Sequence, residues 1–421
     1  MFKVRFFMKL GVIGLGYVGL ITGLGFACSG YKVVGVDVDK EKVDKISIGI
    51  SPIYENGLEE KLKECKGNFK VSSNLTALKD CNIIFICVGT PSKADGSIDL
   101  TYIKKSAEDL SELLDTYKVI AIKSTVVPGT TESIIPILEK SGKKAGRDFG
   151  LGMVPEFLRE GNALEDFFNP DRIVIGAYDE KSREILSEVF KCFSQPKLQT
   201  NLKTAEMIKY SSNSFLATKI SFINEIGNIC KKLGIDTYEV SKGMGLDKRI
   251  GPHFLNSGIG FGGSCFPKDV NALIALADEL GEEPKILKDV MKLNDNQPLR
   301  AVTLLKKHLP NLKGKTIGVL GLAFKANTDD VRYSRAIPVI EALLREGSAV
   351  KAHDPQAEGN FKSIFPDIAY CSPEEVLKSD AIIILTDWAG FEGLDYRGKI
   401  IIDGRGVFKA KEAEKYEGLC W

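Results

Sequence analysis

The sequence is poor in histidine, in closely spaced cysteines and in net charge, and each shortage excludes a class of protein. It has three histidines, and its nine cysteines include no CxxC pair. No zinc-ligand spacing exists, and we expect no metal. Lys plus Arg number 57 against 56 Asp plus Glu, which argues against a nucleic-acid-binding protein. Hydrophobic residues at 44% and charged residues at 27% exclude long disorder and a polytopic membrane protein.

The cysteines and one uncharged stretch bear on where the protein resides. An odd number of scattered cysteines is typical of a reduced cytosolic chain with mostly buried thiols. Residues 10–31 are uncharged and follow Lys3, Arg5 and Lys9, the outline of a signal peptide or membrane anchor. Seven glycines interrupt that stretch, and no small-x-small cleavage site precedes a fresh start. We therefore expect a cytoplasmic protein without a membrane segment. Met8 is an alternative start that would leave residues 1–7 as a disordered extension.

The first half of the chain alternates short apolar runs with helical patterns. With 421 residues, the chain is long enough for two or three domains of about 150 residues. Near-continuous apolar runs are typical of parallel strands buried on both faces. The pattern predicts strands at 10–13, 32–36, 83–88, 119–122 and 149–154, and helices at 17–29, 41–48, 102–114 and 131–140. Such alternation indicates a doubly wound α/β sheet.

The middle of the chain has a different pattern, and the last third repeats the first. Apolar residues at helical spacing predict one long helix over 204–233, and a second helix over 268–280 follows a glycine-rich loop. We expect this helical part to carry a subunit interface. Alternation resumes at Lys315, where the runs GVIGLG and VVGVD of the first part have counterparts in GVLGL and VKAHD. This part predicts strands at 316–321, 349–353, 381–385 and 400–403, and helices at 335–346 and 373–378.

The fold class we expect is α/β, with two Rossmann-like doubly wound domains joined by a central all-helical domain that contains one long helix. The predicted boundaries are 1–200, 201–300 and 301–421.

A glycine fingerprint opens the first helix. Gly14, Gly16 and Gly19 form GxGxxG after a strand, which allows a tight turn and close backbone approach to a pyrophosphate. Asp37 ends the next strand, where its carboxylate can bind a ribose 2′-hydroxyl and would repel a 2′-phosphate. This favours NAD over NADP, although the nearby Lys40 and Lys42 leave the choice open.

The second copy of the strand lacks this fingerprint. Gly321 is followed by Leu-Ala-Phe-Lys, and we expect no second dinucleotide there. Lys325, Arg332 and Arg335 are basic groups near a strand end. They suit an anionic ligand or cofactor phosphates, and a solvated charge cluster is the alternative.

The run GIGFGGSCFPKD, residues 258–269, is the second strong motif. A glycine-rich loop lets the backbone wrap a substrate. Cys265 precedes a predicted helix start, and the helix N-terminus and Lys268 both favour its thiolate. Asp269 is close enough to act as a base or to position a group. A merely buried thiol is the alternative interpretation.

The complete set of motifs resembles the UDP-glucose/GDP-mannose 6-dehydrogenase family. The resemblance runs in order from about residue 9 to 410, and it rests on GVIGLGYVGL, SPIYENGLE, FICVGTP, KSTVVPGTT, PEFLREGNA, NSFLATKISFINEI, GFGGSCFPKD, GLAFKANTDDVRYS and VKAHDP. One departure is Asn56, where the family more often has proline.

The resemblance implies an NAD-dependent oxidation of the C6 alcohol of a nucleotide sugar to a carboxylate, with two NAD+ used in sequence. It implies that the first domain binds NAD, the last binds the UDP-sugar, and the middle one forms a dimer. It also implies that Cys265 is the nucleophile. A thiolate captures the aldehyde as a thiohemiacetal, and a second hydride loss gives a thioester that water hydrolyses.

The resemblance also assigns roles to other positions. Lys209 and Asn213, one turn apart on the long helix, would stabilise the oxyanion at C6. Glu156 would be the general base, acting through water with Thr125 and Asp269, and Glu160 either joins the cofactor set or is only structural. The cofactor set is Gly14, Gly16, Tyr17, Val18, Gly19, Asp37, Val88, Gly89, Thr90, Thr125, Glu160, Lys268 and Arg332. The substrate set is Glu156, Phe157, Leu158, Arg159, Lys209, Asn213, Arg249, Phe254, Leu255, Asn256, Gly258, Phe261, Gly262, Phe324, Lys325 and Arg405.

Several alternatives stay open. In the family that the sequence resembles, an arginine corresponding to Arg249 enters the site of a neighbouring subunit. The resemblance therefore implies a homodimer or a higher homo-oligomer. UDP-glucose is the expected substrate and GDP-mannose is the alternative. A UDP-N-acetylhexosamine is less favoured, because that branch generally has Pro-Glu-Arg where this chain has Pro-Glu-Phe157. A two-electron hydroxyacid dehydrogenase would not need Cys265. A non-enzymatic NAD-binding or scaffold protein would not need Cys265, Lys209, Asn213 and Asp269 together.

Overall fold

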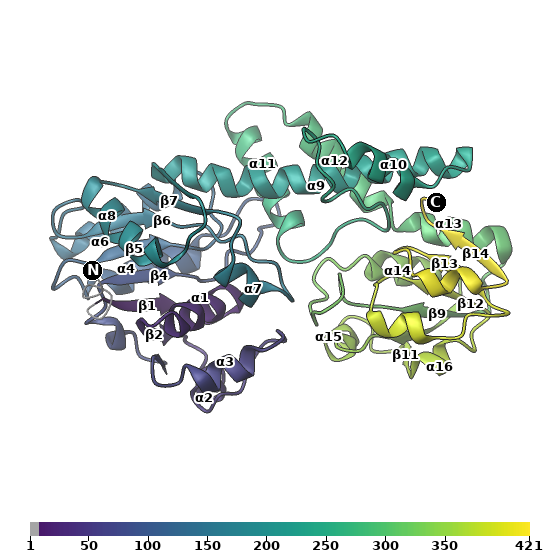
Figure 1. Cartoon of the computed structure of the whole chain (residues 1–421), viewed down its shortest axis with the longest axis horizontal. Helices are drawn as coiled ribbons and strands as arrows, with labels where there is room; N and C mark the ends of the chain where they lie inside the picture. Colours follow the sequence, from purple (N-terminus) through teal and green to yellow (C-terminus); the bar gives the residue numbers. More distant parts are fainter. Residues whose placement is uncertain (1–7) are drawn as a thin grey trace. The chain divides into compact units, whose positions relative to one another are not determined.

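The computed structural model describes residues 8–421 and consists of two compact units. The first unit ends at Ser212 and the second comprises Asn213–Trp421. The boundary lies inside the long helix α9, Leu202–Leu233 (Figure 1). The expectation that residues 1–7 are a disordered extension lies outside the described residues. The three-domain division stays a prediction.

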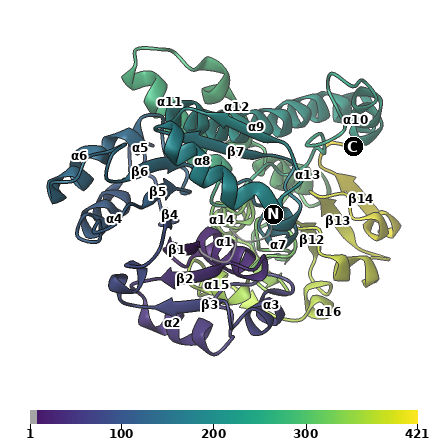
Figure 2. The same cartoon turned by 60° about the vertical axis from the view of Figure 1, so that its left-hand side comes forward.

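The first unit is built on a sheet of eight strands in the order β3-β2-β1-β4-β5-β6-β7-β8 (Figure 2). Neighbouring strands are parallel except β6 and β7, which run antiparallel. The strands are β1 Lys9–Ile13, β2 Lys32–Val36, β3 Phe69–Ser72, β4 Ile83–Ile86, β5 Val119–Ile122, β6 Gly150–Met153, β7 Ile173–Ala177 and β8 Lys197–Thr200.

Helices cover both faces of this sheet. Successive strand residues point to opposite faces, and they therefore belong to two separate cores. In β5, Val119 and Ala121 face the core under α1 and α8, whereas Ile120 and Ile122 face the core under α4 and α6. The helices are α1 Tyr17–Cys28, α2 Lys40–Ser47, α3 Leu58–Glu64, α4 Thr101–Ser111, α5 Thr130–Ser133, α6 Ile135–Leu138, α7 Ala163–Phe168 and α8 Glu180–Val189, with 3-10 turns at Leu75–Leu78, Glu139–Ser141 and Phe190–Cys192.

The single helix expected over 131–140 is wrong. The segment forms two four-residue helices, α5 and α6, with a break at Ile134. Pro136 lies in the first turn of α6. Proline has no N–H to continue a preceding helix but is tolerated at a helix start, so the chain restarts there.

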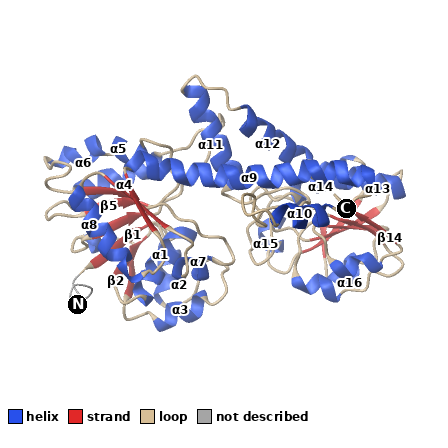
Figure 3. Ribbon diagram, turned by 45° about the horizontal axis from the view of Figure 1, so that its top comes forward, coloured by secondary structure: helices blue, strands red, loops and turns tan. Residues whose placement is uncertain are grey.

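The second unit contains six parallel strands in the order β11-β10-β9-β12-β13-β14, shown in red in Figure 3. This 3-2-1-4-5-6 order is that of a Rossmann sheet, which confirms the expected second α/β part. The strands are β9 Thr316–Leu320, β10 Ala349–His353, β11 Ala369–Tyr370, β12 Ala381–Ile384, β13 Ile400–Asp403 and β14 Lys415–Gly418. The helices are α10 Thr237–Gly245, α11 Phe266–Glu279, α12 Lys285–Asn296, α13 Leu299–His308, α14 Ala336–Arg345, α15 Glu358–Lys362 and α16 Pro373–Val376, with 3-10 turns at Ala389–Gly393 and Phe408–Glu412.

A small separate core lies where α9, the glycine-rich loop, α11 and α12 meet. It contains Ala217, Phe261, Val270 and Val290. This all-helical part before β9 confirms the expected helical middle of the chain. The core fixes the glycine-rich loop against three helices, α9, α11 and α12.

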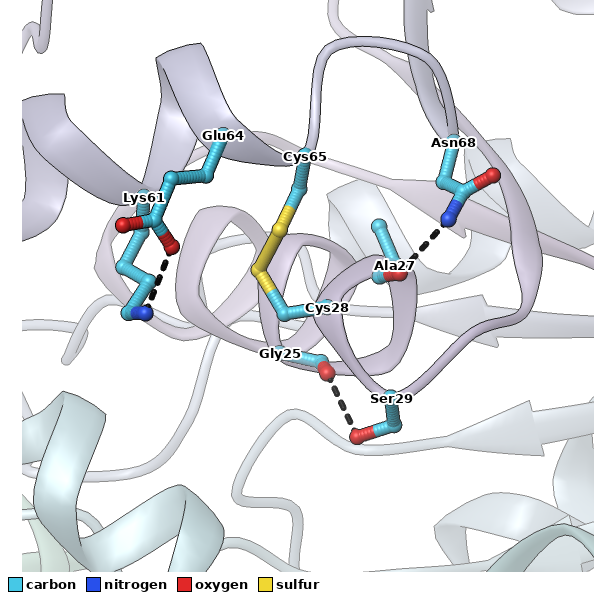
Figure 4. Close-up of a disulfide and its surroundings, with 8 residues drawn as sticks. All are labelled: Gly25, Ala27, Cys28, Ser29, Lys61, Glu64, Cys65 and Asn68. Carbon is cyan, nitrogen blue, oxygen red and sulfur yellow. Dashed lines mark hydrogen bonds and ion pairs between the residues drawn. A yellow bond between two sulfur atoms is a disulfide. The ribbon is translucent and has the colours of Figure 1, made fainter.

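The expectation of reduced thiols is wrong for one cysteine pair. Cys28 at the end of α1 and Cys65 after α3 form a disulfide, with their Cα atoms 5.4 Å apart (Figure 4). The pair is separated by 37 residues, so no local spacing reveals it. The chain brings the two helix ends together, and the Asn68 side chain also donates to Ala27 O at 3.2 Å.

In residues 8–421, no helix is both long and apolar enough to span a bilayer.

Candidate active site

The glycine fingerprint has the backbone that a pyrophosphate site requires. Gly14 has φ +87° and donates to Val36 O at 2.8 Å. A Cβ on Gly19 would lie 1.7 Å from Gly14 O, whereas a Cβ on Gly16 would meet no atom within 4 Å. The positive φ explains the glycine at position 14, and the close approach to Gly14 O explains the glycine at position 19. The open space at Gly16 lies at the N-terminus of α1, where an anion is stabilised. Tyr17 and Val18 begin that helix.

Asp37 follows β2 as a nearly buried carboxylate. Its Oδ2 accepts from Leu15 N at 2.7 Å and from Lys42 Nζ at 3.0 Å. Burial raises the pKa of Asp37, but the N–H groups of Asp39 and Leu15 and the Lys42 ammonium outweigh burial and hold it below its ordinary value. Asp37 is therefore an anion, and Lys42 is paired with it.

The ends of β4 and β5 form the next part of the same sheet edge. Thr90 Oγ1 donates to Thr125 O at 3.0 Å, and Ser124 Oγ donates to Val88 O at 2.7 Å. A Cβ on Gly89 would meet no atom within 4 Å. Four residues of the expected cofactor set are thus brought together at the carboxyl ends of the strands, where doubly wound sheets bind ligands.

A buried acid joins the fingerprint helix to the loop that follows β6. Glu55 accepts hydrogen bonds from Tyr17 Oη, from Gly161 N at 2.8 Å and from Ala163 N at 2.7 Å. Burial and the Glu55 carboxylate raise the pKa of Tyr17, and Glu160 contributes in the same direction. Glu160 therefore lies near the cofactor helix. The motif SPIYENG was noted from the sequence, but the role of Glu55 was not.

Glu156 and Lys209 form a buried ion pair in the first unit. Glu156 Oε1 lies 2.9 Å from Lys209 Nζ, and Glu156 Oε2 accepts from Leu158 N at 2.5 Å. Burial raises the pKa of Glu156, but the Lys209 ammonium and the Leu158 N–H outweigh it and hold that pKa below its ordinary value. The pair contains one expected base and one expected oxyanion donor.

Two further expected substrate residues lie in this loop. The ring of Phe157 has the Arg172 guanidinium 3.6 Å and Lys209 Nζ 5.4 Å from its centroid, so cations on two elements fix its position. The Arg159 side chain is 62% exposed and pairs with Asp166 at 2.5 Å. Asp166 accepts from the Arg159 main-chain N–H as well as from its guanidinium, so the pair fixes both the backbone and the side chain of Arg159.

Cys265 occupies the N-cap position of α11 in the second unit. Its Sγ lies 3.6 Å from Ser264 Oγ, and Pro267 lies in the first turn of the helix. Helix N-termini stabilise anions, including a thiolate.

Asp269 lies one turn into α11 and is 1% exposed. Its Oδ1 accepts from Lys268 Nζ at 2.6 Å, and its Oδ2 accepts from Asn213 Nδ2 at 2.6 Å. Asn213 is also buried. The structure therefore brings three expected site residues into one hydrogen-bonded chain beside Cys265.

The glycine-rich loop packs tightly on the segment after β9. Gly263 N donates to Arg332 O at 2.9 Å, and a Cβ on Gly262 would lie 2.3 Å from Tyr333 O. Tyr333 has φ 52°, a conformation that non-glycine residues rarely adopt and that clusters at functional sites. Arg332 pairs with Asp330 at 2.6 Å.

Arg405 and Phe324 also meet in the second unit. The Arg405 guanidinium donates to Leu385 O and to Phe324 O, each at 2.9 Å. Lys325 Nζ lies 5.6 Å from the Phe324 ring. Arg405 thus fixes the backbone of two strand-end loops.

The segment from Asp247 to Asn256 lies at the surface. The Arg249 side chain is 89% exposed and pairs with Asp247, two residues earlier, at 2.6 Å, and an exposed pair of this kind contributes little stability. Phe254 is exposed with φ 61°, Asn256 is exposed and Leu255 is buried. Arg249 is therefore available to a second molecule.

The comparisons with known proteins decide the family. The NAD binding domain of the UDP-glucose/GDP-mannose dehydrogenase family matches residues 8–194, its central domain 203–296 and its UDP binding domain 318–410. The chain belongs to the UDP-glucose/GDP-mannose dehydrogenase family. The match confirms the resemblance and NAD as the cofactor, and the chain is an NAD-dependent dehydrogenase.

Similar proteins match over nearly full length. The UDP-glucose 6-dehydrogenase AglM of Haloferax volcanii is 43% identical, over 98% of this chain and 100% of that relative. A UDP-glucose dehydrogenase structure from Pyrobaculum islandicum has TM-score 0.97 and 45% identity, covering 100% of this chain and 99% of that one. A UDP-D-ManNAc dehydrogenase structure from Pyrococcus horikoshii has TM-score 0.88 and 31% identity, covering 98% and 99%.

Proposed function

We propose that the chain oxidises UDP-glucose at C6 to UDP-glucuronate, with two NAD+ reduced and one water consumed per sugar. The observation that carries the proposal is the hydrogen-bonded chain Asn213–Asp269–Lys268, with Asn213 and Asp269 buried, one turn from Cys265 at the start of α11. A two-electron dehydrogenase or a scaffold needs neither this nucleophile nor its buried partners.

The first unit has the features needed to hold NAD. The open space at Gly16 and the Asp37 carboxylate suit a pyrophosphate and an adenosine ribose. Bound NAD+ accepts the hydride in each of the two oxidations. Val88, Gly89, Thr90 and Thr125 at the ends of β4 and β5 would line the cofactor beside the fingerprint, and Glu160, Lys268 and Arg332 complete the proposed cofactor set.

In the first oxidation the C6 hydroxyl loses a proton and C6 loses a hydride. We assign the proton, by way of water, to the Asp269 carboxylate. The Lys209 ammonium and the Asn213 amide, which are four residues apart on α9, would donate to the C6 oxygen as negative charge develops on it. The product is an aldehyde at C6.

Cys265 keeps that aldehyde bound. Its thiolate adds to C6, the former carbonyl oxygen takes up a proton, and the adduct is a thiohemiacetal. Loss of a second hydride and of the hydroxyl proton gives a thioester. Water then attacks the acyl carbon, the thiolate leaves, and the carboxylate is released.

Glu156 is the proposed base for the hydrolytic step. Its pKa lies below the ordinary value, so it is an anion at neutral pH, which is the form that a base requires. Its partner Lys209 compensates the buried charge while Glu156 is ionised. Phe157, Leu158 and Arg159 are the proposed loop contacts to the sugar nucleotide.

The second unit supplies the rest of the proposed substrate site. Phe254, Leu255, Asn256, Gly258, Phe261 and Gly262 come from the loop before α11, and Phe324, Lys325 and Arg405 from the α/β part. The greater similarity to UDP-glucose dehydrogenases, 43–45% against 31% for the UDP-D-ManNAc enzyme, favours UDP-glucose. GDP-mannose stays the alternative.

A homodimer is part of this proposal. Phe215, Phe222 and Ile229 on α9 recur every seven residues and are 65%, 46% and 53% exposed. A heptad-spaced apolar stripe is the seam of a pair of helices, so a second copy of this chain is the partner that fits it. The exposed Arg249 would then enter the partner's substrate site.

We also propose a cytoplasmic location, where NAD and nucleotide sugars are available. The Cys28–Cys65 disulfide does not conflict with this, because intracellular proteins of hyperthermophiles contain disulfides, and one similar structure comes from a hyperthermophilic archaeon.

The decisive experiment measures NADH release across a panel of nucleotide sugars. UDP-glucose should give the highest kcat/KM and two NADH per sugar. A preference for GDP-mannose or a UDP-N-acetylhexosamine would show that the chain has the substrate specificity of another branch of the family. Release of one NADH per sugar would refute the four-electron reaction.

A further inference from the structure

Three buried side-chain amides hold the glycine-rich loop before Cys265. Asn224 on α9, Asn294 on α12 and Gln297 just after α12 are each no more than 1% exposed. All three hydrogen-bond to the main chain of residues 258–261. Buried polar groups are stable when they are hydrogen-bonded, and these three amides find partners on one short loop.

Asn294 makes a two-point contact. Its Oδ1 accepts from Phe261 N at 2.8 Å, and its Nδ2 donates to Phe261 O at 3.1 Å. Both main-chain groups of Phe261 are therefore satisfied by one side chain. Gly260 has φ +98°, and a Cβ there would lie 2.6 Å from Asn294 Oδ1, so the loop lies directly against this amide.

Gly258 is held in the same way by two side chains. Its N–H donates to Asn224 Oδ1 at 2.7 Å, and its carbonyl accepts from Gln297 Nε2 at 2.9 Å. Gln297 Oε1 also accepts from Asn228 Nδ2 at 2.9 Å. The amide cluster thus links α9 to the end of α12 through the loop.

The loop needs such contacts because of its composition. Glycines lose more backbone freedom on ordering than any other residue. A substrate-wrapping backbone is effective only if it is already in place, because a misplacement of about 1 Å can cost roughly a hundredfold in rate. Only Gly262, Gly263 and Ser264 separate Phe261 from Cys265, so the position of Phe261 also limits where the thiol can lie.

We propose that Asn294, with Asn224 and Gln297, is a positioning residue that fixes the glycine-rich loop for the sugar nucleotide and fixes Cys265 at the α11 N-terminus. The inference rests on the proposed function for its substrate, but not for its effect on the thiol.

The test compares Asn294→Ala with Asn296→Ala in the full-length enzyme. Asn296 is the same residue type two positions along, it is exposed, and its side chain donates to Lys292 O of its own helix at 2.8 Å. For Asn294→Ala we expect kcat/KM for UDP-glucose to fall about 10- to 100-fold with a raised KM. The KM for NAD should change less than the KM for UDP-glucose, because most of the proposed cofactor set, including the glycine fingerprint, belongs to the first unit. Asn296→Ala should match the wild type.

A second measurement is the rate of iodoacetamide alkylation of Cys265 in the protein without substrate. It should fall by about threefold or more in Asn294→Ala, because the thiol spends less time at the helix N-terminus. If Asn294→Ala fails to fold, Gln297→Met tests the same loop by removing the donor to Gly258 O.

The two roles give different results. A purely structural amide would lower kcat in proportion to the folded fraction and leave both KM values and the alkylation rate unchanged, and this result would overturn the proposal. If wild-type enzyme oxidises no nucleotide sugar, the proposed function fails alone, since the alkylation rates still test the positioning of Cys265.

Discussion

Lys209 Nζ lies 2.9 Å from Glu156 Oε1, and the two side chains are 4% and 6% exposed. The pair joins helix α9 to the loop after β6, so the general base of the proposed hydrolysis and an oxyanion donor fix each other. Because Glu156 is shielded from water, the Lys209 ammonium is the main group that keeps its carboxylate ionised.

Lys209→Met should destabilise the protein at pH 7 by about 3–5 kcal/mol, because it leaves a buried carboxylate without its cation. The pKa of Glu156 is lowered in the wild type. Its stabilising contribution is therefore complete above the ordinary carboxyl pKa and is lost as the pH falls below it. In the variant, burial without Lys209 raises that pKa, so protonation relieves the cost. The stability gap should narrow from pH 7 to pH 4, as measured by chemical denaturation.

Lys203→Met is the matched control. Lys203 lies on the same helix, is exposed and pairs with Glu132 at 3.0 Å. A surface pair contributes at most about 1 kcal/mol. Equal losses in the two variants, or a gap that does not change with pH, would show that the Glu156 pair is not a buried ion pair in solution.

Asp37→Ala should reduce the preference for NAD+ over NADP+. The carboxylate would repel a 2′-phosphate, and its removal also releases Lys42 Nζ, now 3.0 Å away, to bind that phosphate. We expect the ratio of kcat/KM values to fall by about tenfold or more, which is ~1.4 kcal/mol of discrimination. Asp44→Ala, an exposed acid on the same α2, should leave the ratio unchanged. A wild type that prefers NADP+ would contradict the role of Asp37.

The sequence predicted most of the strands that a continuous apolar run encodes, but the fully buried strand β7, IVIGA, was missed. The buried strands β1, β2, β4, β5 and β6 appear within a few residues of their expected positions, because continuous Val and Ile runs are typical of parallel strands. The edge strands β3, β8, β11 and β14 were not predicted. They are short, and β8 for example is half exposed, so no apolar run marks them. Only tertiary pairing makes these segments strands.

The candidate site, like the fold, was predicted only in part. Motif residues such as Cys265 and Asp37 were predicted, but their supporting residues were not. Asn294 occupies the apolar face of α12 together with Val290, and an amide at a core position of an amphipathic helix is a signal that could have been noticed. Its partner, the main chain of Phe261, has no sequence signature. Cys28 and Cys65 likewise meet only because α1 and α3 pack together.

The Cys28–Cys65 disulfide should contribute to thermal stability. Closing a loop with a sequence separation of 37 stabilises by about 4 kcal/mol in the chain-entropy model. The Cys28→Ser/Cys65→Ser variant should melt roughly 10 °C lower, with Cys371→Ser as the control. Unreduced denatured protein should titrate with seven thiols and the reduced protein with nine. Nine thiols without reductant would mean that the bond does not form.

The stripe Phe215, Phe222 and Ile229 should be the dimer seam. Phe222→Glu buries a charge in that seam, so sedimentation should show a monomer at micromolar concentration. Activity should fall with it, because Arg249 no longer reaches a partner's site. Phe408→Glu changes an equally apolar residue that is 74% exposed away from α9, and it should remain a dimer. A wild-type monomer with full activity on dilution would contradict the seam.

Cys265 variants test the four-electron reaction most directly. Cys265→Ala can still lose the first hydride and should stop near the aldehyde, whereas Cys265→Ser should stall as a covalent ester or turn over slowly, because an alkoxide is a poorer leaving group than a thiolate.

Loss of the nucleophile should lower the overall rate by ~10³-fold or more. Single-turnover NADH counting with mass spectrometry of the intact protein distinguishes the cases, and Cys371→Ala, a cysteine in the same unit whose burial raises its pKa, should behave as wild type. If Cys265→Ala still forms two NADH per sugar near the wild-type rate, the thiol is only a packed side chain. The second oxidation must then proceed through an aldehyde hydrate, in which water takes the place of sulfur. The chain Asn213–Asp269–Lys268 would then have no role in the chemistry of a thiol adduct.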